Sequence, residues 1–326
     1  MARQVVKLTQ VLMKHQADAT TAVASLAAAD VMEFEDGFKL SIDAKVTDVK
    51  LTGAGFGQSK SVIGVQECSF SGTLPMRTNG AEGPTGAGQC GKALAICGCV
   101  EAATDSDADS ALDRFIYTPS NSITAWKSGT FLGESGNVDS NGSLLRKVQN
   151  CMGNAKITLD FDNDIAKLTI DGKGALTSAD AVGSQVTVTP LAVDVPSLKG
   201  AVINFFGDTD YCLTNLEFDL GNASTVTLCP SNTNGLGQSV ITERSVKWTA
   251  KVYKDTLAIA TTPLLAGTLG TISVAWGAVP NKITVSTTKA QITSVKDGDQ
   301  NGVETYELSG ICVDNDLAIQ FDCAVA

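Results

Sequence analysis

The 326-residue sequence contains a single histidine, His15. Serine-hydrolase triads, most general acid–base sites and many zinc sites depend on histidine, so one residue leaves little room for such chemistry. A zinc site made of cysteines is not indicated either, because Cys90, Cys97 and Cys99 lack the two C-x2-C pairs that such a site needs. No other set of titratable residues has the spacing of an active site. We therefore expect neither an enzyme nor a protein with a bound metal or cofactor.

Charged and aromatic residues are also scarce. Charged side chains make up 18% of the chain, and 24 Lys and Arg face 35 Asp and Glu, which gives a formal net charge of −11. A protein that grips nucleic acid needs clustered basic residues, so this balance argues against specific DNA or RNA binding. Aromatic residues make up 6%, which argues against a binding module with an exposed aromatic patch.

Long apolar runs are absent as well. No stretch has the length needed to span a membrane, and Lys7, Lys14 and His15 interrupt the apolar core that a signal peptide would need. The nine cysteines are odd in number and irregular in spacing, which does not suit a disulfide framework. These features predict a protein assembled in the cytoplasm, with cysteines used as small buried apolar residues.

What the sequence does contain is two-residue alternation, clearest between Tyr211 and Tyr253. Apolar and polar side chains alternate at 215–220 and again at 246–252, the pattern of strands with one buried and one wet face. The segment between these strands includes the run Pro230–Gly237, which is rich in turn residues. The pattern predicts a two-stranded antiparallel ribbon with a large mobile loop at its tip. Because helical periodicity is nearly absent elsewhere, we expect a mainly β protein.

A similar ribbon is predicted in the first half, around a Gly-rich break at 53–57 and an alternating stretch at 68–74. Further short matches follow in the same order in both halves: residues 93–96 with 256–259, 123–126 with 273–276, and 155–158 with 290–293. The shared order, rather than any one match, indicates a duplicated β-rich unit.

The repeat divides the chain into four segments. We expect an N-terminal arm at 1–36, a first β-unit at 37–176, an extended connector at 177–196 and a second β-unit at 197–326. Each unit is predicted to be an antiparallel β-sandwich or half-barrel with one short helix, at 91–102 and 255–265. Weak apolar periodicity predicts that residues 1–29 lie outside the core, so that their removal leaves both units folded but blocks polymerisation.

Two kinds of motif allow another interpretation. Gly86–Ala93 is similar to a phosphate-binding P-loop, but Ala93 stands where a magnesium-binding hydroxyl is needed, which favours a flexible loop before a helix. Acidic runs at 105–109, 160–164 and 297–302 are similar to calcium loops. The third has Leu308 where a calcium loop needs glutamate, and Asp-Gly and Asn-Gly favour a hairpin turn there.

Several passages resemble the tail tube proteins of long-tailed bacteriophages. The sequences LEFDLGN (216–222) and VITERSVKWTAKV (240–252) are similar to the central hairpin of that family. The first unit carries similar passages at 49–76, 91–103, 115–129 and 152–174, and the second unit another at 290–310. The similarity covers nearly the whole chain in the right order, although insertions and extra cysteines in the first unit depart from the usual pattern.

The resemblance implies a structural protein of the virion. Tube subunits of that family form rings whose sheets join between subunits into a closed β-barrel, and the rings stack into a hollow tube that conducts double-stranded DNA without binding it. The implied partners are further copies of the chain, the tape measure protein, and the tail terminator and baseplate proteins. We expect carboxylates to face the lumen and to repel DNA; the candidates are Glu217, Asp219 and Asp48. The candidates for contacts between stacked rings are Gly55, Phe56, Asn232, Asn234 and Leu236.

The duplication also predicts the ring symmetry. Where one unit per chain requires six copies, a chain with two units closes the same wall with three copies, which gives a pseudo-hexameric ring. If one half decorates the outside instead, six copies form the ring. The competing functions are those of a tail terminator, of a baseplate or distal tail hub protein, and of a β-sandwich binding module.

Overall fold

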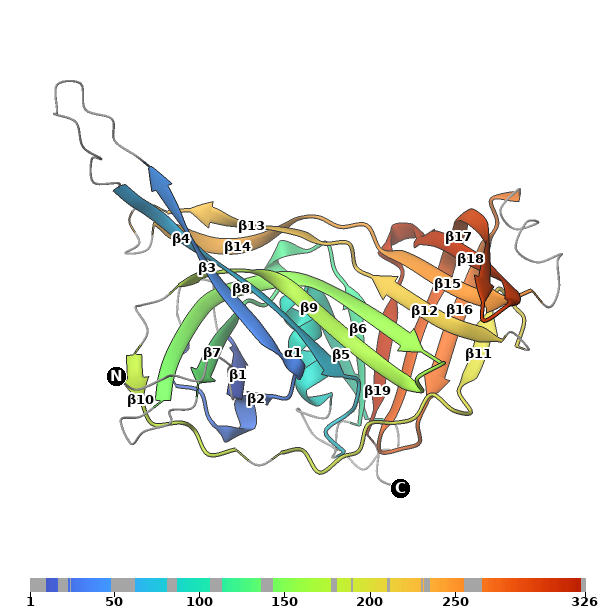
Figure 1. Ribbon diagram of the computed structural model, residues 1–326, viewed down its shortest axis with the longest axis horizontal. Coiled ribbons are helices and arrows are strands. Elements are labelled where there is room, and N and C mark those ends of the chain that lie inside the picture. The colour runs from blue at the N-terminus through green and yellow to red at the C-terminus, as the bar shows by residue number, and fades with distance from the viewer. Residues whose placement is uncertain are drawn as a thin grey trace.

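The computed structural model describes residues 10–16, 23, 25–47, 62–80, 87–105, 113–135, 143–176, 181–188, 190–209, 212–229, 231, 235–254 and 266–323. Within these ranges the protein is mainly β, and its paired strands are antiparallel (Figure 1). One α-helix, α1 (Gly88–Ile96), has both ends inside the described ranges. The part of the chain described here contains no helix with the length and apolar character to cross a bilayer.

The strands of the N-terminal half are β1 (Gln10–His15), β2 (Val31–Met32), β3 (Glu35–Thr47), β4 (Val62–Pro75), β5 (Cys99–Thr104), β6 (Arg114–Pro119), β7 (Gly129–Ser135), β8 (Ser143–Asp160), β9 (Ile165–Leu176) and β10 (Ala181–Gly183). The strands of the C-terminal half are β11 (Val202–Phe205), β12 (Leu213–Asp219), β13 (Ala223–Leu228), β14 (Leu236–Glu243), β15 (Lys247–Tyr253), β16 (Leu269–Trp276), β17 (Lys282–Gln300), β18 (Val303–Cys312) and β19 (Ala318–Asp322). Short 3-10 turns lie at Ala28–Asp30 (η1), Ile123–Ala125 (η2) and Val313–Asn315 (η3).

The ribbon predicted from alternation is confirmed. β12 pairs with β15, with Phe218 opposite Trp248 and Leu216 opposite Ala250. All four of these side chains are buried, because alternation places them on one face of both strands. The tip of the ribbon is more ordered than expected: β13 and β14 form a second antiparallel pair within it.

The two halves repeat one order of neighbouring strands. In the first half the order is β1–β7–β8–β9–β4–β3, and in the second it is β11–β16–β17–β18–β15–β12. β10 pairs with the beginning of β8, and β19 pairs with the beginning of β17. Seven strands of each half therefore have a counterpart in the other, in the same chain order and with the same partners.

Residue registers agree as well as strand order. Phe70 of β4 lies opposite Gly172 of β9, and Trp248 of β15 lies opposite Gly310 of β18. A Cβ at Gly172 would lie 2.7 Å from the Phe70 ring, and one at Gly310 would overlap the Trp248 ring. In each half a glycine therefore lies opposite a large buried ring, because even a methyl group at that position would overpack the core.

The short sequence matches were less accurate than the order they suggested. Residues 123–126 include η2, whereas the counterpart of β16 is β7. Ala155 lies opposite Ile170, and Val295 lies opposite Leu308, the counterpart of Ile170. The counterpart of Ala155 is therefore Val295 and not Ala290, as the short match implied. Both long strands contain a β-bulge, which shifts registers in a way that a tetrapeptide match does not reveal. The match at 256–259 and the helix expected at 255–265 lie outside the described residues.

The first helix is displaced from its predicted range of 91–102. It begins at Gly88 and ends at Ile96, where Cys97 caps it and Gly98 takes a positive φ of 73°. A glycine in the left-handed region just past the last helical turn is a common helix stop. The residues that follow form β5, which pairs with β6.

The predicted N-terminal arm contains part of the core. β1 pairs with β7 and β2, and its Val11, Leu12 and Met13 are 5% exposed or less. The expectation that residues 1–29 lie outside the core is therefore wrong for this strand. Three consecutive buried residues lack a one-sided pattern: Val11 and Met13 belong to the main apolar core, and Leu12, on the opposite face of the strand, is fully buried as well.

The two halves share one apolar core and are joined by paired strands. β8 pairs with β7 over its first part and with β12 over residues 156–160, while β9 occupies its other edge. β6 of the first half pairs with β19 of the second. One long strand path, β3–β4–β9–β8–β12–β15–β18–β17, therefore crosses both halves, and it does not close into a barrel within the described residues.

Candidate assembly interface

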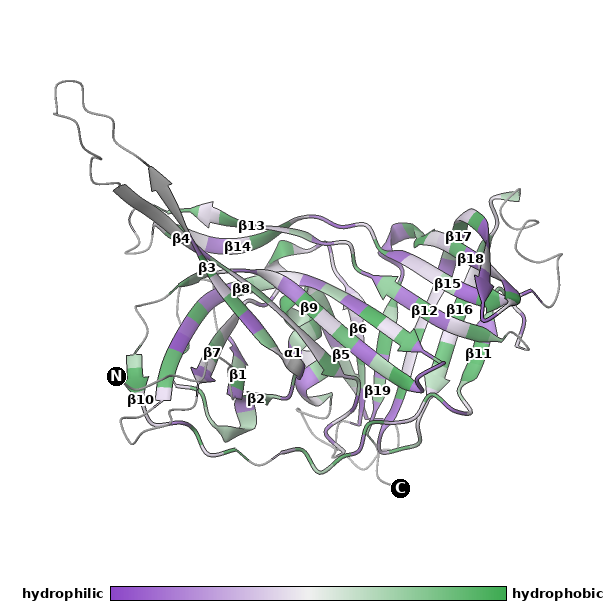
Figure 2. Ribbon diagram, in the orientation of Figure 1, coloured by the Kyte–Doolittle hydropathy of each residue, from purple (hydrophilic) through white to green (hydrophobic). Residues whose placement is uncertain are grey.

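The long strand path has one apolar face and one polar face. Along β12, Leu216 and Phe218 are buried in the core, whereas Glu217 and Asp219 are half-buried on the opposite face. The same alternation is visible as hydrophobic and hydrophilic bands along β8, β9 and β12 (Figure 2). The polar face belongs to strands of both halves.

The carboxylates on this face have partners. Glu217 forms an ion pair with Lys156 of β8 at 2.7 Å, and Asp219 Oδ1 accepts hydrogen bonds from Asn154 Nδ2 at 2.9 Å and from the Gly221 backbone N–H at 2.8 Å. Both side-chain partners, Lys156 and Asn154, come from β8 of the first half.

Two more ion pairs lie along the first half, Lys167 with Glu35 and Lys173 with Glu67. All of these pairs are partly exposed, so each contributes less than about 1 kcal/mol. Their effect is to balance charge, and the face is therefore polar rather than uniformly acidic. Asp48, the third lumen candidate, lies outside the described residues.

Two strand edges remain open at the ends of the strand path. Within the described residues, β3 pairs with β4 only, and residues 295–300 of β17 pair with β18 only. By register, Leu40 of β3 is the counterpart of Phe218 of β12. Residues 296–300 of β17 are likewise the counterparts of residues 156–160 of β8. The two open edges are thus the counterparts of the two strands that join inside the chain. Charged residues, including Lys39 and Asp297, line them, which limits uncontrolled pairing.

The β3–β4 hairpin extends beyond the sheet. Pairing of β4 with β9 ends at Glu67 opposite Ala175, whereas β3 and β4 continue to pair as far as Thr47 opposite Val62 (Figure 1). Gly55 and Phe56, the first two stacking candidates, lie outside the described residues between these strands.

The β13–β14 hairpin occupies the equivalent place in the second half. It reaches back over the first half and lies near β4 (Figure 1). Asn232 and Asn234 lie outside the described residues. Leu236 is 3% exposed within the single chain, so its side chain is not available for contact with another ring.

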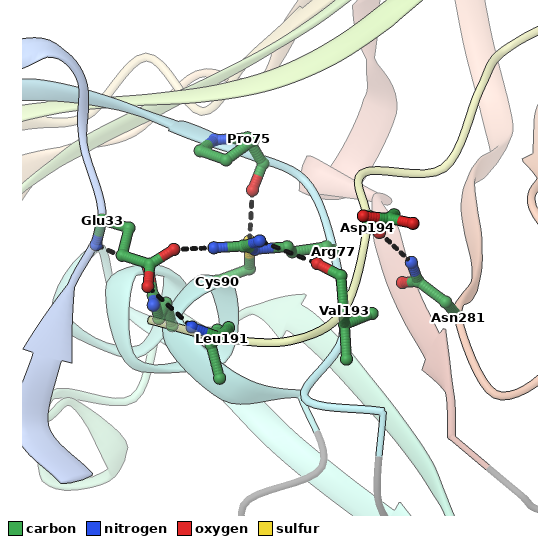
Figure 3. Close-up of polar contacts among 9 residues, drawn as sticks. Glu33, Pro75, Arg77, Cys90, Leu191, Val193, Asp194 and Asn281 are labelled. Atoms are coloured by element: carbon green, nitrogen blue, oxygen red, sulfur yellow. Dashed lines mark hydrogen bonds and ion pairs between the residues drawn. The ribbon is translucent and has the colours of Figure 1, made fainter. Parts of the chain in front are cut away.

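A polar cluster fixes the connector to both halves (Figure 3). Arg77 forms an ion pair with Glu33 and donates a hydrogen bond to the Val193 carbonyl at 2.8 Å. Glu33 also accepts a hydrogen bond from the Leu191 N–H at 2.8 Å. Asp194, the connector residue after Val193, accepts a hydrogen bond at its backbone carbonyl from Asn281 Nδ2 of the second half at 2.7 Å. Residues 191–194 of the expected connector are thus held by hydrogen bonds to both halves, and its residues 181–183 form a short strand, β10, that pairs with β8.

A second polar cluster, which the sequence did not suggest, surrounds Arg244. Its guanidinium donates to Asn222 Oδ1 at 2.7 Å, to the Ser120 carbonyl at 2.7 Å and to the Cys97 carbonyl at 3.0 Å. It therefore ties the ribbon of the second half to the end of α1. A single arginine among short-range strand patterns gives no sequence signal for such a role.

The three cysteines considered from sequence, Cys90, Cys97 and Cys99, are all buried. Burial raises the pKa of Cys90 to about 11 and that of Cys99 to about 12, so both thiols are protonated near neutral pH. Among the described residues, no group of three or more His, Cys, Asp or Glu side chains has a metal-binding arrangement. The Asn301-Gly302 turn has positive φ at both residues and closes the β17–β18 hairpin, as favoured over a calcium loop.

His15 gives the protein a testable pH dependence. Its Nε2 lies 3.0 Å from the Lys92 carbonyl. Burial lowers the pKa of His15 below the ordinary value; the hydrogen bond to the Lys92 carbonyl and the charge of Glu101 oppose this shift, and the charges of Lys127 and Lys92 add to it. The unfolded chain therefore binds a proton more readily than the folded one, and stability falls as pH falls through the unfolded pKa of about 6.5.

We expect the urea midpoint to be lower near pH 5.5 than near pH 7.5, and His15→Gln to reduce that difference. Glutamine keeps an N–H donor for the carbonyl but does not titrate. Equal pH dependence in the two proteins would show that His15 is not the responsible group.

Compared with known proteins, the sequence matches no protein-family model and no curated protein.

Proposed function

We propose that this chain is a tail tube protein of a long-tailed bacteriophage, a structural virion protein that assembles as stacked rings into a hollow tube for double-stranded DNA. Each chain supplies two tube units, and three chains form a pseudo-hexameric ring. The proposal extends the sequence resemblance, which spans both halves of the chain.

The observation that carries the proposal is the internal joint between the halves. β8 of the first unit and β12 of the second pair edge to edge with Phe218 opposite Ile157. In the part of the chain that the structure describes, their counterparts, residues 296–300 of β17 and one edge of β3, are open at opposite ends of the strand path. A joint that already exists once inside the chain can be repeated between chains with the same geometry.

Repetition of this joint gives a head-to-tail interface, which closes into a ring when the rotation per step divides a full turn. In the repeated joint, Leu40 of one copy lies opposite Asp297 of the next. Closure removes both open edges, which an isolated subunit would otherwise present to any exposed strand.

The polar face of the strand path is then the wall of the lumen, with Glu217 and Asp219 on it. Because Glu217 is paired with Lys156, this wall offers phosphates neither a basic patch nor a strongly repelling surface. Double-stranded DNA, which binds proteins mainly through clustered basic groups, would pass with little retention. The projecting β3–β4 hairpin would contact the adjacent ring. Assembly takes place in the host cytoplasm, where the tape measure, terminator and baseplate proteins join the tube.

Negative-stain electron microscopy of the purified chain tests the proposal. We expect rings or stacked tubes with a central channel. Single rings that never stack would favour a tail terminator or baseplate hub protein instead, and monodisperse monomers would favour a β-sandwich binding module and refute the proposal.

A further inference from the structure

Two pockets lie beside counterpart strands of the two halves, β11 and β1. A pocket of about 360 Å³ lies beside β11 and includes Ile203, and a pocket of about 300 Å³ lies beside β1 and includes Val11. Met13 of β1 lies opposite Phe131 of β7, and Phe205 of β11 lies opposite Ile272 of β16. Met13 and Phe205 are therefore counterparts, and so are Val11 and Ile203, which lie two residues earlier in each strand. We call them the β11 pocket and the β1 pocket.

The β8–β9 turn of the first half forms one wall of the β11 pocket. Phe161 and Asp164 of this turn line the pocket. The Phe161 N–H donates to the Thr214 carbonyl at 3.1 Å, and Asp164 accepts from Ser197 Oγ and from the Lys199 N–H, each at 2.6 Å. At the internal joint, therefore, the hairpin turn of one unit contacts the segment that leads into the first strand of the next unit, and also its β12 strand.

The β1 pocket lacks such a turn within the described chain. Its walls include the apolar side chains of Phe34, Phe38, Val188 and Pro190, together with Gln10 and Glu33. The turn that corresponds to the β8–β9 turn is the β17–β18 turn, and it lies at the end of the molecule away from β1 (Figure 1). Beside it, Val303 is 51% exposed.

We propose that the β1 pocket receives the β17–β18 turn of a second copy of this chain, with Val303 as its apolar contact. This inference rests on the proposed function, because it requires that the internal joint is repeated between copies. The β17–β18 turn has two residues between its paired strand ends, where the β8–β9 turn has four. Val303, the counterpart of Ile165, is thus the apolar side chain nearest the tip, and it takes the role that Phe161 has in the internal joint.

The position of the two partners fits a closed ring. Strand β1, beside the pocket, and the strands β17 and β18 lie toward opposite ends of the molecule (Figure 1). A head-to-tail interface between copies requires such an arrangement. Burial of an exposed valine against phenylalanine and proline side chains is therefore available only between copies, and it adds apolar contact to the strand pairing of the joint.

Disulfide trapping tests the docking directly. Cys212 and Cys229, the two cysteines that are not buried, are first replaced with serine, and Val303→Cys is combined with Val188→Cys. Under mild oxidation we expect reducible covalent dimers and trimers. In the matched control, Val303→Cys is combined with Val202→Cys, which lies 71% exposed on the counterpart strand β11, and this pair should not cross-link.

A variant without cysteine chemistry provides an independent readout. Because Val303 is exposed, Val303→Asp should leave the fold intact but raise the protein concentration needed for ring formation about tenfold or more. Rings and tubes without cross-linking above the control, together with unchanged assembly of Val303→Asp, would overturn the docking while leaving the proposed function in place. Monomers without any cross-link would overturn both.

Discussion

The Leu12→Asp variant is expected to lose its native fold. Leu12 is fully buried on β1, and β1 pairs with both β7 and β2. An unpaired carboxylate at this position would lose the apolar contacts of leucine and also the hydration of its own charge, at a cost of about 4 kcal/mol or more. Domains of this kind are stable by only about 5–15 kcal/mol, so most of the stability of the first half would be lost.

The matched control is Lys14→Asp, two residues further along the same strand. Lys14 is exposed, so its replacement should change stability by less than about 0.5 kcal/mol. Circular dichroism and urea unfolding of the two variants separate the outcomes. If both variants fold equally well, β1 is a dispensable arm, as the weak apolar periodicity of residues 1–29 predicts.

The second large effect concerns ring stacking. We expect that replacing residues 48–61 with Asn-Gly leaves folded protein that forms rings but no tubes. Thr47 and Val62 are paired, so a two-residue type I′ turn can join them without strain. The variant keeps the strands that reach β9 and removes only the segment beyond the projecting ends of β3 and β4. Size-exclusion chromatography and electron microscopy measure rings and tubes in the same sample.

A companion variant shortens the β13–β14 turn between Leu228 and Leu236, which are also paired. Because that hairpin lies back on the first half instead of projecting, we expect a smaller loss of tubes. Normal tubes from the first variant would show that the β3–β4 hairpin is not the stacking element. Folded monomers from it would assign the hairpin to ring closure.

Alternation made the central ribbon predictable from sequence. In a strand with one buried and one solvent-exposed face, apolar and polar residues alternate, as at Leu216 and Glu217. The order of the repeated elements was predictable for the same reason, and it indicated the duplicated unit without any knowledge of strand pairing. The pairing order of the seven counterpart strands supports a repeat strand by strand, whereas the short matches at 123–126 and 155–158 did not align counterpart residues.

Other features left weaker signals. β1 is short and lies in a basic segment, so its burial depends on β7, which is more than a hundred residues away in the chain. β13 and β14 flank a turn-rich run that is typical of a loop, yet they pair with one another. The partners of Glu217 and Arg244 come from distant strands and carbonyls, which no local pattern encodes.

The rotational symmetry of the assembled ring tests the central claim most directly. Cryo-electron microscopy of a tube cross-section, or native mass spectrometry of isolated rings, counts the chains in one ring. Three chains per ring, with six similar wall segments and β17 of each copy beside β3 of the next, is the result that the duplicated unit predicts. Six chains per ring, with one half of each chain outside the wall, would contradict it.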